Sequence, residues 1–321
     1  MHLTVTGATG FIGSAVARVA LERGHRVTAL VRKPNDDRFA AHEHLVQRHW
    51  DLADPATVGN ALDGVDALLH LAALVPARYD DPAFAEPCFR ANALASRELA
   101  ETAARRGVAH FVYSSTGALY TAGPSPSTEN ESIAPPVRAP YYLTSKFAGE
   151  SFVAAECARH GTRLTTVRIA SAYGPGMQSS SVVARFIDAA RRGASLNVVG
   201  GDHTADFVYV DDVALAIVIA TERRVTGTLN VGTGVATSIR QLAEVVRDIS
   251  DASCEIVDDG AVSMRSGFAA LDIRRAVSAL DWHPMDLRSG LRAMMRGTSD
   301  HPVPRHTYMY RDNPTTRDTR A

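Results

Sequence analysis

A glycine-rich segment directly after a short apolar run constrains this chain most. The apolar run covers residues 3–6, and residues 7–13 read Gly-Ala-Thr-Gly-Phe-Ile-Gly. Residues 14–23 follow with helical periodicity and end at Gly24. Glycines between a strand and a helix permit a tight turn and close packing, and the free amides of the helix N-terminus attract a pyrophosphate. The segment therefore predicts a dinucleotide-binding strand–turn–helix unit.

Further apolar runs alternate with helical stretches along the first half of the chain. The apolar runs are residues 27–31, 66–71, 110–114 and 165–169, and the helical stretches include residues 91–106 and 142–159. Continuous apolar strands separated by helices indicate a parallel sheet covered on both faces. After residue 176 short strands and helices mix without this rhythm. We predict a Rossmann-type, doubly wound parallel sheet of the α/β class with a smaller, mixed C-terminal substrate-binding domain.

The two predicted domains interleave along the chain. Residues 1–172 and 206–232 are assigned to the dinucleotide-binding domain. Residues 173–205 and 233–297 are assigned to the substrate-binding domain. Residues 298–321 form a polar tail, which we expect to lie against a neighbouring surface.

Charge and cysteine content exclude several classes of protein. The chain has 321 residues, with 34 basic and 35 acidic side chains and a formal net charge of −1, so a protein that neutralises nucleic-acid phosphates is not expected. Three distant cysteines and scattered histidines argue against a disulfide framework or a metal site. The first residues lack the basic region and the small-residue cleavage site of a secretory signal, so no signal peptide is expected, and the longest apolar stretch is too short to span a bilayer. We expect a cytoplasmic protein with no membrane partner.

The residues after the second strand bear on the choice of cofactor. An acidic side chain there would accept a hydrogen bond from the adenosine ribose, but the chain has Arg32 and Lys33. These two cations could bind a 2′-phosphate, so we predict a preference for NADP(H), with NAD(H) as the alternative. Asp51 and Leu52, at the end of the next strand, are placed to meet the adenine.

A tyrosine and a lysine four residues apart suggest the chemistry. Tyr142 and Lys146 would share one face of a helix, where the ammonium would stabilise a phenolate and lower the tyrosine pKa toward working pH. Tyr142 is thus a candidate general acid or base. Thr116 lies at the end of the strand that begins at residue 110, where a hydroxyl can reach the reacting oxygen. We predict Thr116, Tyr142 and Lys146 as the catalytic residues.

Taken together, these motifs resemble the extended short-chain dehydrogenase/reductase family, often called the NAD-dependent epimerase/dehydratase family. Further landmarks are His-Leu-Ala-Ala at 70–73, Tyr-Gly-Pro-Gly at 173–176, Phe-Val-Tyr-Val-Asp-Asp at 207–212 and Leu-Asp-Trp-His-Pro at 280–284. The resemblance spans nearly the whole chain. It implies that hydride moves between nicotinamide C4 and a substrate carbon while Tyr142 moves the proton.

The resemblance also implies which residues contact the cofactor and the substrate. Besides Arg32, Lys33, Asp51, Leu52, Tyr142 and Lys146, the expected cofactor contacts are Gly7, Thr9, Gly10, Phe11, Ile12, Gly13, Leu71, Ala72, Ala73, Asn92, Ser114 and Ile169. The expected substrate contacts are Leu74, Thr116, Ser171 and Arg265. A homodimer paired through the helices at 91–106 and 142–159 is implied as well.

Several departures from the family pattern bear on the reaction. Dehydratases carry an Asp-Glu pair where this chain has Gly117 and Ala118, which disfavours dehydration. Nucleotide-sugar enzymes usually have Asn at Ser171 and a phosphate-binding Arg at Ala205, whereas Arg265 matches a second such arginine. Loss of one cation removes a charge-assisted contact to a diphosphate.

We predict a ketoreductase that transfers hydride to a carbonyl of a sugar-like substrate, of which a nucleotide-linked 4-keto sugar is one candidate. NADPH suits net reduction, which is why the Arg32–Lys33 pair favours this reaction. The alternatives are a nucleotide-sugar epimerase with tightly bound NAD and a reductase of a non-sugar ketone or aldehyde. A non-catalytic NADP-binding sensor is disfavoured because Thr116, Tyr142 and Lys146 are all present.

Overall fold

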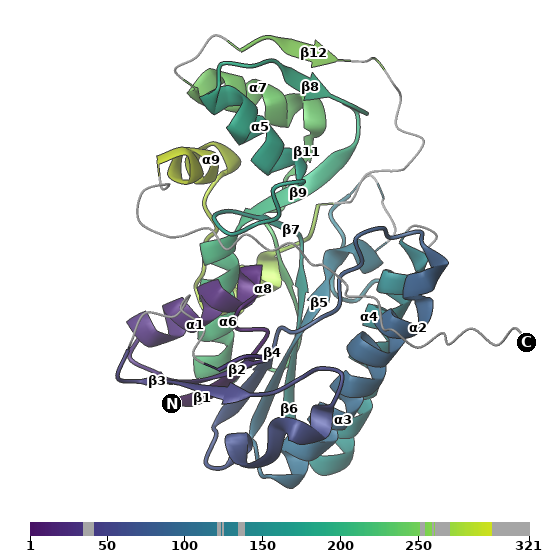
Figure 1. Cartoon of the computed structure of the whole chain (residues 1–321), viewed down its shortest axis with the longest axis vertical. Coiled ribbons are helices and arrows are strands. Elements are labelled where there is room, and N and C mark those ends of the chain that lie inside the picture. Colours follow the sequence, from purple (N-terminus) through teal and green to yellow (C-terminus); the bar gives the residue numbers. More distant parts are fainter. Residues whose placement is uncertain are drawn as a thin grey trace, which may run out of the picture.

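The computed structural model describes residues 1–34, 42–120, 123, 125–133, 139–250, 254–258, 260 and 270–296. Arg265 and the tail at 298–321 lie outside these ranges. A sheet covered by helices makes the larger part of the molecule, and a smaller lobe sits at one end of it (Figure 1).

Seven parallel strands form the main sheet. Their order is β10-β6-β5-β4-β1-β2-β3, so the strand order turns back between β1 and β4. The strands are β1 (His2–Thr6), β2 (Arg26–Val31), β3 (Leu45–His49), β4 (Ala67–His70), β5 (His110–Thr116), β6 (Arg163–Ile169) and β10 (Gly227–Val231). The predicted Rossmann-type parallel sheet is confirmed.

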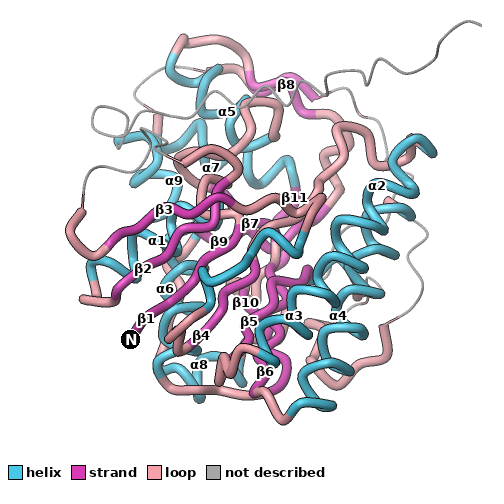
Figure 2. The backbone as a smooth tube through the Cα atoms, turned by 60° about the horizontal axis from the view of Figure 1, so that its bottom comes forward, coloured by secondary structure: helices cyan, strands magenta, loops and turns pink. Residues whose placement is uncertain are grey.

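Helices cover both faces of this sheet (Figures 1 and 2). One face carries α1 (Phe11–Glu22), α6 (Val210–Glu222) and α8 (Arg274–Leu280). The other carries α3 (Ala95–Arg105) and α4 (Pro140–His160), and the connections include α2 (Ala85–Phe89) and the short helices η1 (Pro55–Leu62), η2 (Pro82–Phe84), η3 (Arg90–Leu94) and η4 (Gly117–Leu119).

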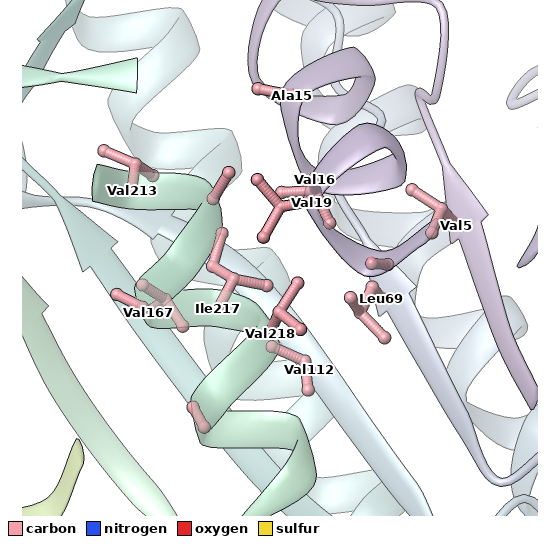
Figure 3. Packing of buried hydrophobic residues seen from close by; sticks show 14 of the residues in the cluster. Val5, Ala15, Val16, Val19, Leu69, Val112, Val167, Val213, Ile217 and Val218 are labelled. Atoms are coloured by element: carbon pink, nitrogen blue, oxygen red, sulfur yellow. The ribbon is translucent and has the colours of Figure 1, made fainter. Parts of the chain in front are cut away.

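Small and β-branched side chains let α1 and α6 pack closely on the sheet. Val16 and Val19 of α1 meet Ile217 and Val218 of α6 (Figure 3), and all four are buried. Strand residues such as Leu69 lie beneath them in the same core. This packing fixes the start of α1 at the edge where β1 and β4 end.

The predicted helix at 91–106 is interrupted. Its first residues form the π-helical turn η3, and α3 begins only at Ala95. The hydroxyl of Ser96 donates to the Asn92 carbonyl at 2.8 Å. Such π turns occur often at functional sites.

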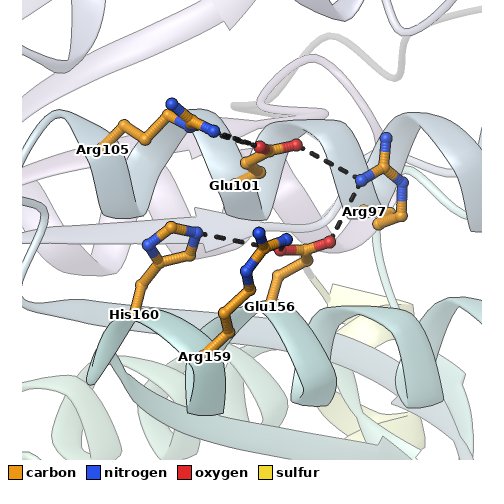
Figure 4. Close-up of polar contacts among 6 residues, drawn as sticks. All are labelled: Arg97, Glu101, Arg105, Glu156, Arg159 and His160. Carbon is orange, nitrogen blue, oxygen red and sulfur yellow. Dashed lines mark hydrogen bonds and ion pairs between the residues drawn. The ribbon is translucent and has the colours of Figure 1, made fainter.

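Ion pairs fasten α4 to α3 on the outer face (Figure 4). Arg97 of α3 bridges the helices, since its guanidinium lies 3.1 Å from Glu156 and 3.3 Å from Glu101. Glu101 also pairs with Arg105 at 2.8 Å. Each exposed pair contributes little by itself, but the network spans the two helices and helps set the position of α4.

The smaller lobe contains two short sheets and a second hydrophobic core. Its elements are β7 (Ser171–Tyr173), α5 (Val182–Arg191), β8 (Leu196–Val198), β9 (Thr204–Tyr209), β11 (Ala236–Ser238), α7 (Ile239–Ile249), β12 (Ile256–Asp258) and α9 (Leu287–Arg296). β9 pairs with β7 and β11 of the smaller lobe. Most of β9 nevertheless lies within residues 206–232, which were predicted to belong to the dinucleotide-binding domain. The domain boundaries therefore stay an interpretation.

Within the described ranges, no helix combines the length and apolarity of a membrane span. Cys88, Cys157 and Cys254 are buried free thiols.

Candidate active site

The glycine-rich turn holds α1 against the end of β1. Gly7 has φ +65°, and its carbonyl accepts the Gly10 amide at 2.8 Å. A Cβ on Gly13 would lie 2.0 Å from the Gly7 oxygen, and a Cβ on Gly7 would lie 2.7 Å from the Ala72 nitrogen. The turn therefore requires glycine at both positions, and α1 starts directly beside the turn that follows β4.

A buried threonine and histidine join these two turns. The Thr6 hydroxyl oxygen accepts the amides of Leu71 and Ala72, both at 3.1 Å. Because these two amides fill its acceptor sites, its proton goes to His70 Nδ1 at 2.7 Å. His70 Nε2 then donates to Ser96 at 2.9 Å. Burial, and next the charge of Lys146, lowers the pKa of His70 to about 3, so this histidine is neutral.

The predicted adenosine contacts lie at the ends of β2 and β3. Arg32 and Lys33 directly follow β2, and both are exposed. Val31, the last residue of β2, is buried. Asp51 accepts the Ala53 amide at 2.9 Å and so closes its own turn.

A cavity of about 470 Å³ opens where the main sheet meets the smaller lobe. It brings together four predicted site residues, Thr116, Tyr142, Ile169 and Ser171. The rest of its lining is Tyr79, Gly117, Ala118, Ala139, Leu143, Ala170, His203, Asp206 and Leu271. The predicted substrate contact Leu74 is not part of this lining.

Lys146 is held at the end of β5. Its side chain is almost fully buried, and Nζ donates to the Ser114 carbonyl at 2.6 Å and lies 4.5 Å from the centre of the Tyr113 ring. Burial lowers the pKa of Lys146 to about 7, and the charge of Glu150 opposes that effect.

Tyr142 faces the cavity one helical turn before Lys146. Burial raises its pKa above the ordinary tyrosine value, and Tyr79 and Cys88 raise it further. The predicted lowering of the Tyr142 pKa is therefore not found in the chain by itself, where burial sets the direction of the shift. The Tyr79 ring packs edge-on against Tyr142, with ring centres 5.7 Å apart.

Asn92, a predicted cofactor contact, has both ends of its side chain engaged by protein atoms. Its oxygen accepts the Leu74 amide at 2.7 Å, and its nitrogen donates to the Leu74 carbonyl at 2.9 Å and to Ser145 at 3.0 Å. Ser145 in turn donates to the Tyr142 carbonyl at 2.7 Å. Asn92 thus braces the first turn of α4 against the segment after β4.

Asp206 is a buried acid that sequence reasoning missed. It accepts the Thr233 amide at 2.7 Å, the Thr233 hydroxyl at 2.6 Å, and the amides of Gly234 and Leu271, both at 3.1 Å. These bonds tie β9 to two other segments at the cavity wall. The sequence pattern that could have indicated its role is an aspartate within a strand of mostly apolar residues.

The paired acids Asp211 and Asp212 belong to the start of a helix. α6 begins at Val210, so both lie in its first turn. Asp211 pairs with Arg18 of α1 at 2.5 Å, and Asp212 accepts the Met285 amide at 3.0 Å. Among the residues that the structure describes, no three metal-binding side chains gather.

A model of the NAD dependent epimerase/dehydratase family matches residues 3–232. The chain belongs to this family. Over 321 aligned positions it is 30% identical to a dTDP-glucose 4,6-dehydratase of Streptomyces griseus, with 94% of each chain covered. It is also 30% identical to a 2-alkyl-3-oxoalkanoate reductase of Stenotrophomonas maltophilia, over 71% of this chain and 67% of that one.

The fold likewise matches solved structures of the family. One is the UDP-glucose 4-epimerase of Thermus thermophilus in complex with NAD, with 26% identity and a TM-score of 0.78. The superposition covers 93% of this chain and 100% of the epimerase. The chain is therefore an enzyme of the epimerase/dehydratase family with the fold of its nucleotide-sugar members.

Proposed function

We propose that this chain is an NAD(H)-dependent epimerase that inverts a carbinol carbon of a nucleotide-linked sugar. The observation that carries the proposal is the cavity in which Thr116 and Tyr142 meet, in a chain that aligns over its length with a UDP-glucose 4-epimerase. In such a reaction the alcohol is oxidised and the resulting ketone is reduced on its opposite face.

The glycine turn fits a dinucleotide. Positions 7 and 13 leave no room for a Cβ, so the backbone amides at the start of α1 stay open to a pyrophosphate. When bound, the nicotinamide accepts and returns the hydride. We propose that Ser114 of β5 and Lys146 of α4 hold the cofactor on the side toward the cavity.

The residues of the cavity supply the proton transfer. Tyr142, as the phenolate, takes the proton of the alcohol, and the phenol so formed returns it to the oxygen of the ketone when the hydride is delivered to the opposite face. The Thr116 hydroxyl holds the reacting oxygen beside it. The Lys146 ammonium, when charged, favours the phenolate form of Tyr142.

The relatives favour epimerisation over the net reduction predicted from the sequence. The ketoreductase reading depended on Arg32 and Lys33 as ligands of a 2′-phosphate, and the solved epimerase named above binds NAD. The two cations directly follow β2 and are exposed. Preference for NADP(H) stays a prediction.

A reductase of a non-sugar carbonyl is the second candidate. The described residues that line the cavity include no Lys or Arg, and Ala118, Leu143 and Leu271 make its wall largely apolar. The similarity to a 2-alkyl-3-oxoalkanoate reductase points the same way.

Incubation with UDP-glucose, other UDP-hexoses and a 3-oxoalkanoate separates the two candidates. We expect a UDP-hexose to be converted to its epimer, with NAD needed only in catalytic amount. The products are followed by NMR, and the nucleotide released from the denatured protein is identified by mass. Turnover of the oxoalkanoate with one NAD(P)H consumed per product, and no epimer from any UDP-hexose, would contradict the epimerase proposal.

We also propose a homodimer paired through α2, η3 and α4. Exposed apolar side chains gather on these elements, namely Phe89, Leu94 and Phe147. A shallow groove of about 580 Å³ lies among Phe89, Leu94 and Tyr141. Light scattering should give twice the chain mass of 34.4 kDa, and Leu94→Glu should reduce it to one chain mass. A wild-type monomer at micromolar concentration would reject the dimer.

A further inference from the structure

The buried ammonium of Lys146 needs a counter-charge. The chain contains two lysines, Lys33 and Lys146, and the second is only 3% exposed. The groups that contact its ammonium, the Ser114 carbonyl and the Tyr113 ring, are neutral. A buried charge is costly unless an opposite charge lies close to it.

Glu150 lies one helical turn beyond Lys146 on the same side of α4. Consecutive residues of β5 hold the two side chains. The Ser114 carbonyl accepts from Lys146, and the Ser115 hydroxyl donates to Glu150 at 2.7 Å. The cation and the carboxylate are therefore held by consecutive residues at the end of one strand.

Arg168 of β6 fixes the carboxylate from the other side. Its Nη2 donates to Glu150 at 2.5 Å and its Nε at 3.3 Å, in a two-point contact. Tyr120 accepts from Arg168 at 2.7 Å and donates to Asn230 of β10 at 2.9 Å. These bonds leave Glu150 little freedom to move.

The register of the sheet explains this arrangement. Ser115, Arg168 and Asn230 are direct partners on the neighbouring strands β5, β6 and β10, so their side chains leave the same face of the sheet. The next row begins with Thr116 and Ile169, which line the cavity. A polar row thus lies directly behind the predicted reaction site.

The other groups around Lys146 supply no negative charge. His70 of β4 is neutral, because burial lowers its pKa to about 3. Burial raises the pKa of Tyr113 of β5 and of Tyr142 of α4, so both phenols keep their protons. Arg168 of β6 is a cation, and Asn92 and Ser96 on the neighbouring helices are uncharged.

We propose that Glu150, held by Ser115 and Arg168, is the counter-ion that positions the Lys146 ammonium and keeps it charged. It acts through Lys146 and does not touch the reacting atoms, so it is a positioning residue. Its importance for turnover rests on the proposed function, but its effect on Lys146 does not.

The two-lysine composition makes the test direct. Protein grown with lysine labelled with ¹³C at Cε gives two side-chain signals, which Lys33→Arg assigns. The titration midpoint of Lys146 is then read without any substrate. We expect Glu150→Gln to lower that midpoint by about one pH unit, because an adjacent negative charge is removed.

Glu156→Gln is the matched control. Glu156 is also a mostly buried carboxylate of α4 in an ion pair with an arginine, but it lies ten residues beyond Lys146, about 15 Å along the helix. This variant should leave the Lys146 midpoint in place. If Glu150→Gln does not fold, Glu150→Asp draws the carboxylate back and should lower the midpoint by a smaller step.

A Lys146 midpoint in Glu150→Gln equal to that of the wild type would overturn the proposal, as would an equal shift in Glu156→Gln. For Glu150→Asp, a midpoint at or above the wild-type value would do the same. Where turnover is measured, the alkaline limb of kcat/KM should move with the midpoint, whereas a merely structural role would lower activity without moving that limb.

Discussion

Replacement of Tyr142 by phenylalanine is expected to lower kcat about a thousandfold, the usual size of a lost general acid or base. The change removes only the phenol oxygen. The ring keeps its edge-on contact with Tyr79, so the cavity and the helix should be preserved. Cofactor binding, measured by fluorescence of the reduced nicotinamide, should remain close to that of the wild type.

Tyr79→Phe is the control for this experiment, since it removes a second phenol oxygen from the same cavity. It should retain kcat within about tenfold, because the proton transfer is assigned to Tyr142 and not to Tyr79. If Tyr142→Phe kept its activity while Tyr79→Phe lost it, the roles of the two tyrosines would have to be exchanged.

Gly13→Ala is expected to weaken cofactor binding by more than about a hundredfold, because a displacement near 1 Å at a binding site has effects of this size. The new Cβ would lie 2.0 Å from the backbone oxygen of Gly7, which cannot rotate away as a side chain can. Either the turn or the start of α1 must move. Isothermal titration with NAD measures the loss, and thermal unfolding measures the accompanying change in stability.

Gly123→Ala is the control for the added methyl group. A Cβ at that position meets nothing within 4 Å, and its φ lies outside the left-handed region. Cofactor affinity should be unchanged. An unchanged affinity in Gly13→Ala as well would contradict the account of the glycine turn.

The parts of the site that are local in sequence could be predicted. The glycine turn lies between one strand and the helix that follows it, and Tyr142 and Lys146 are four residues apart on one helix. In both cases the spacing alone determines which residues meet. Most of the parallel sheet was predictable because most of its strands are short, largely apolar runs, whereas β3 carries Gln, Arg and His and is not one.

The residues behind the site could not be predicted because the sheet brings them together. Ser115, Arg168 and Asn230 come from three strands far apart in the sequence, and only the register places them in one row. A charged residue inside the apolar run at 165–169 was the available signal. The short strands of the smaller lobe, such as β8 with three residues, carry too few positions for a period to show.

The charge state of Tyr142 could not be predicted from the sequence either. Spacing indicates that Lys146 is near, but the effect of burial on the pKa depends on how much of the chain covers each group. Here burial raises the pKa of Tyr142 and lowers that of Lys146, so the pair alone does not produce a phenolate. The charge of Glu150, which the polar row holds in place, favours the charged form of Lys146.

The central claim is that the cavity is a nicotinamide redox site that works through Tyr142. The most direct measurement is the absorbance of the nicotinamide in single turnovers, with the protein loaded with NAD or NAD(P)H and mixed with the UDP-hexoses and the oxoalkanoate. The account predicts a change in absorbance with the wild type for at least one of these compounds, and none with Tyr142→Phe at equal cofactor loading. No change with the wild type for any compound, or the same change with Tyr142→Phe, would contradict it.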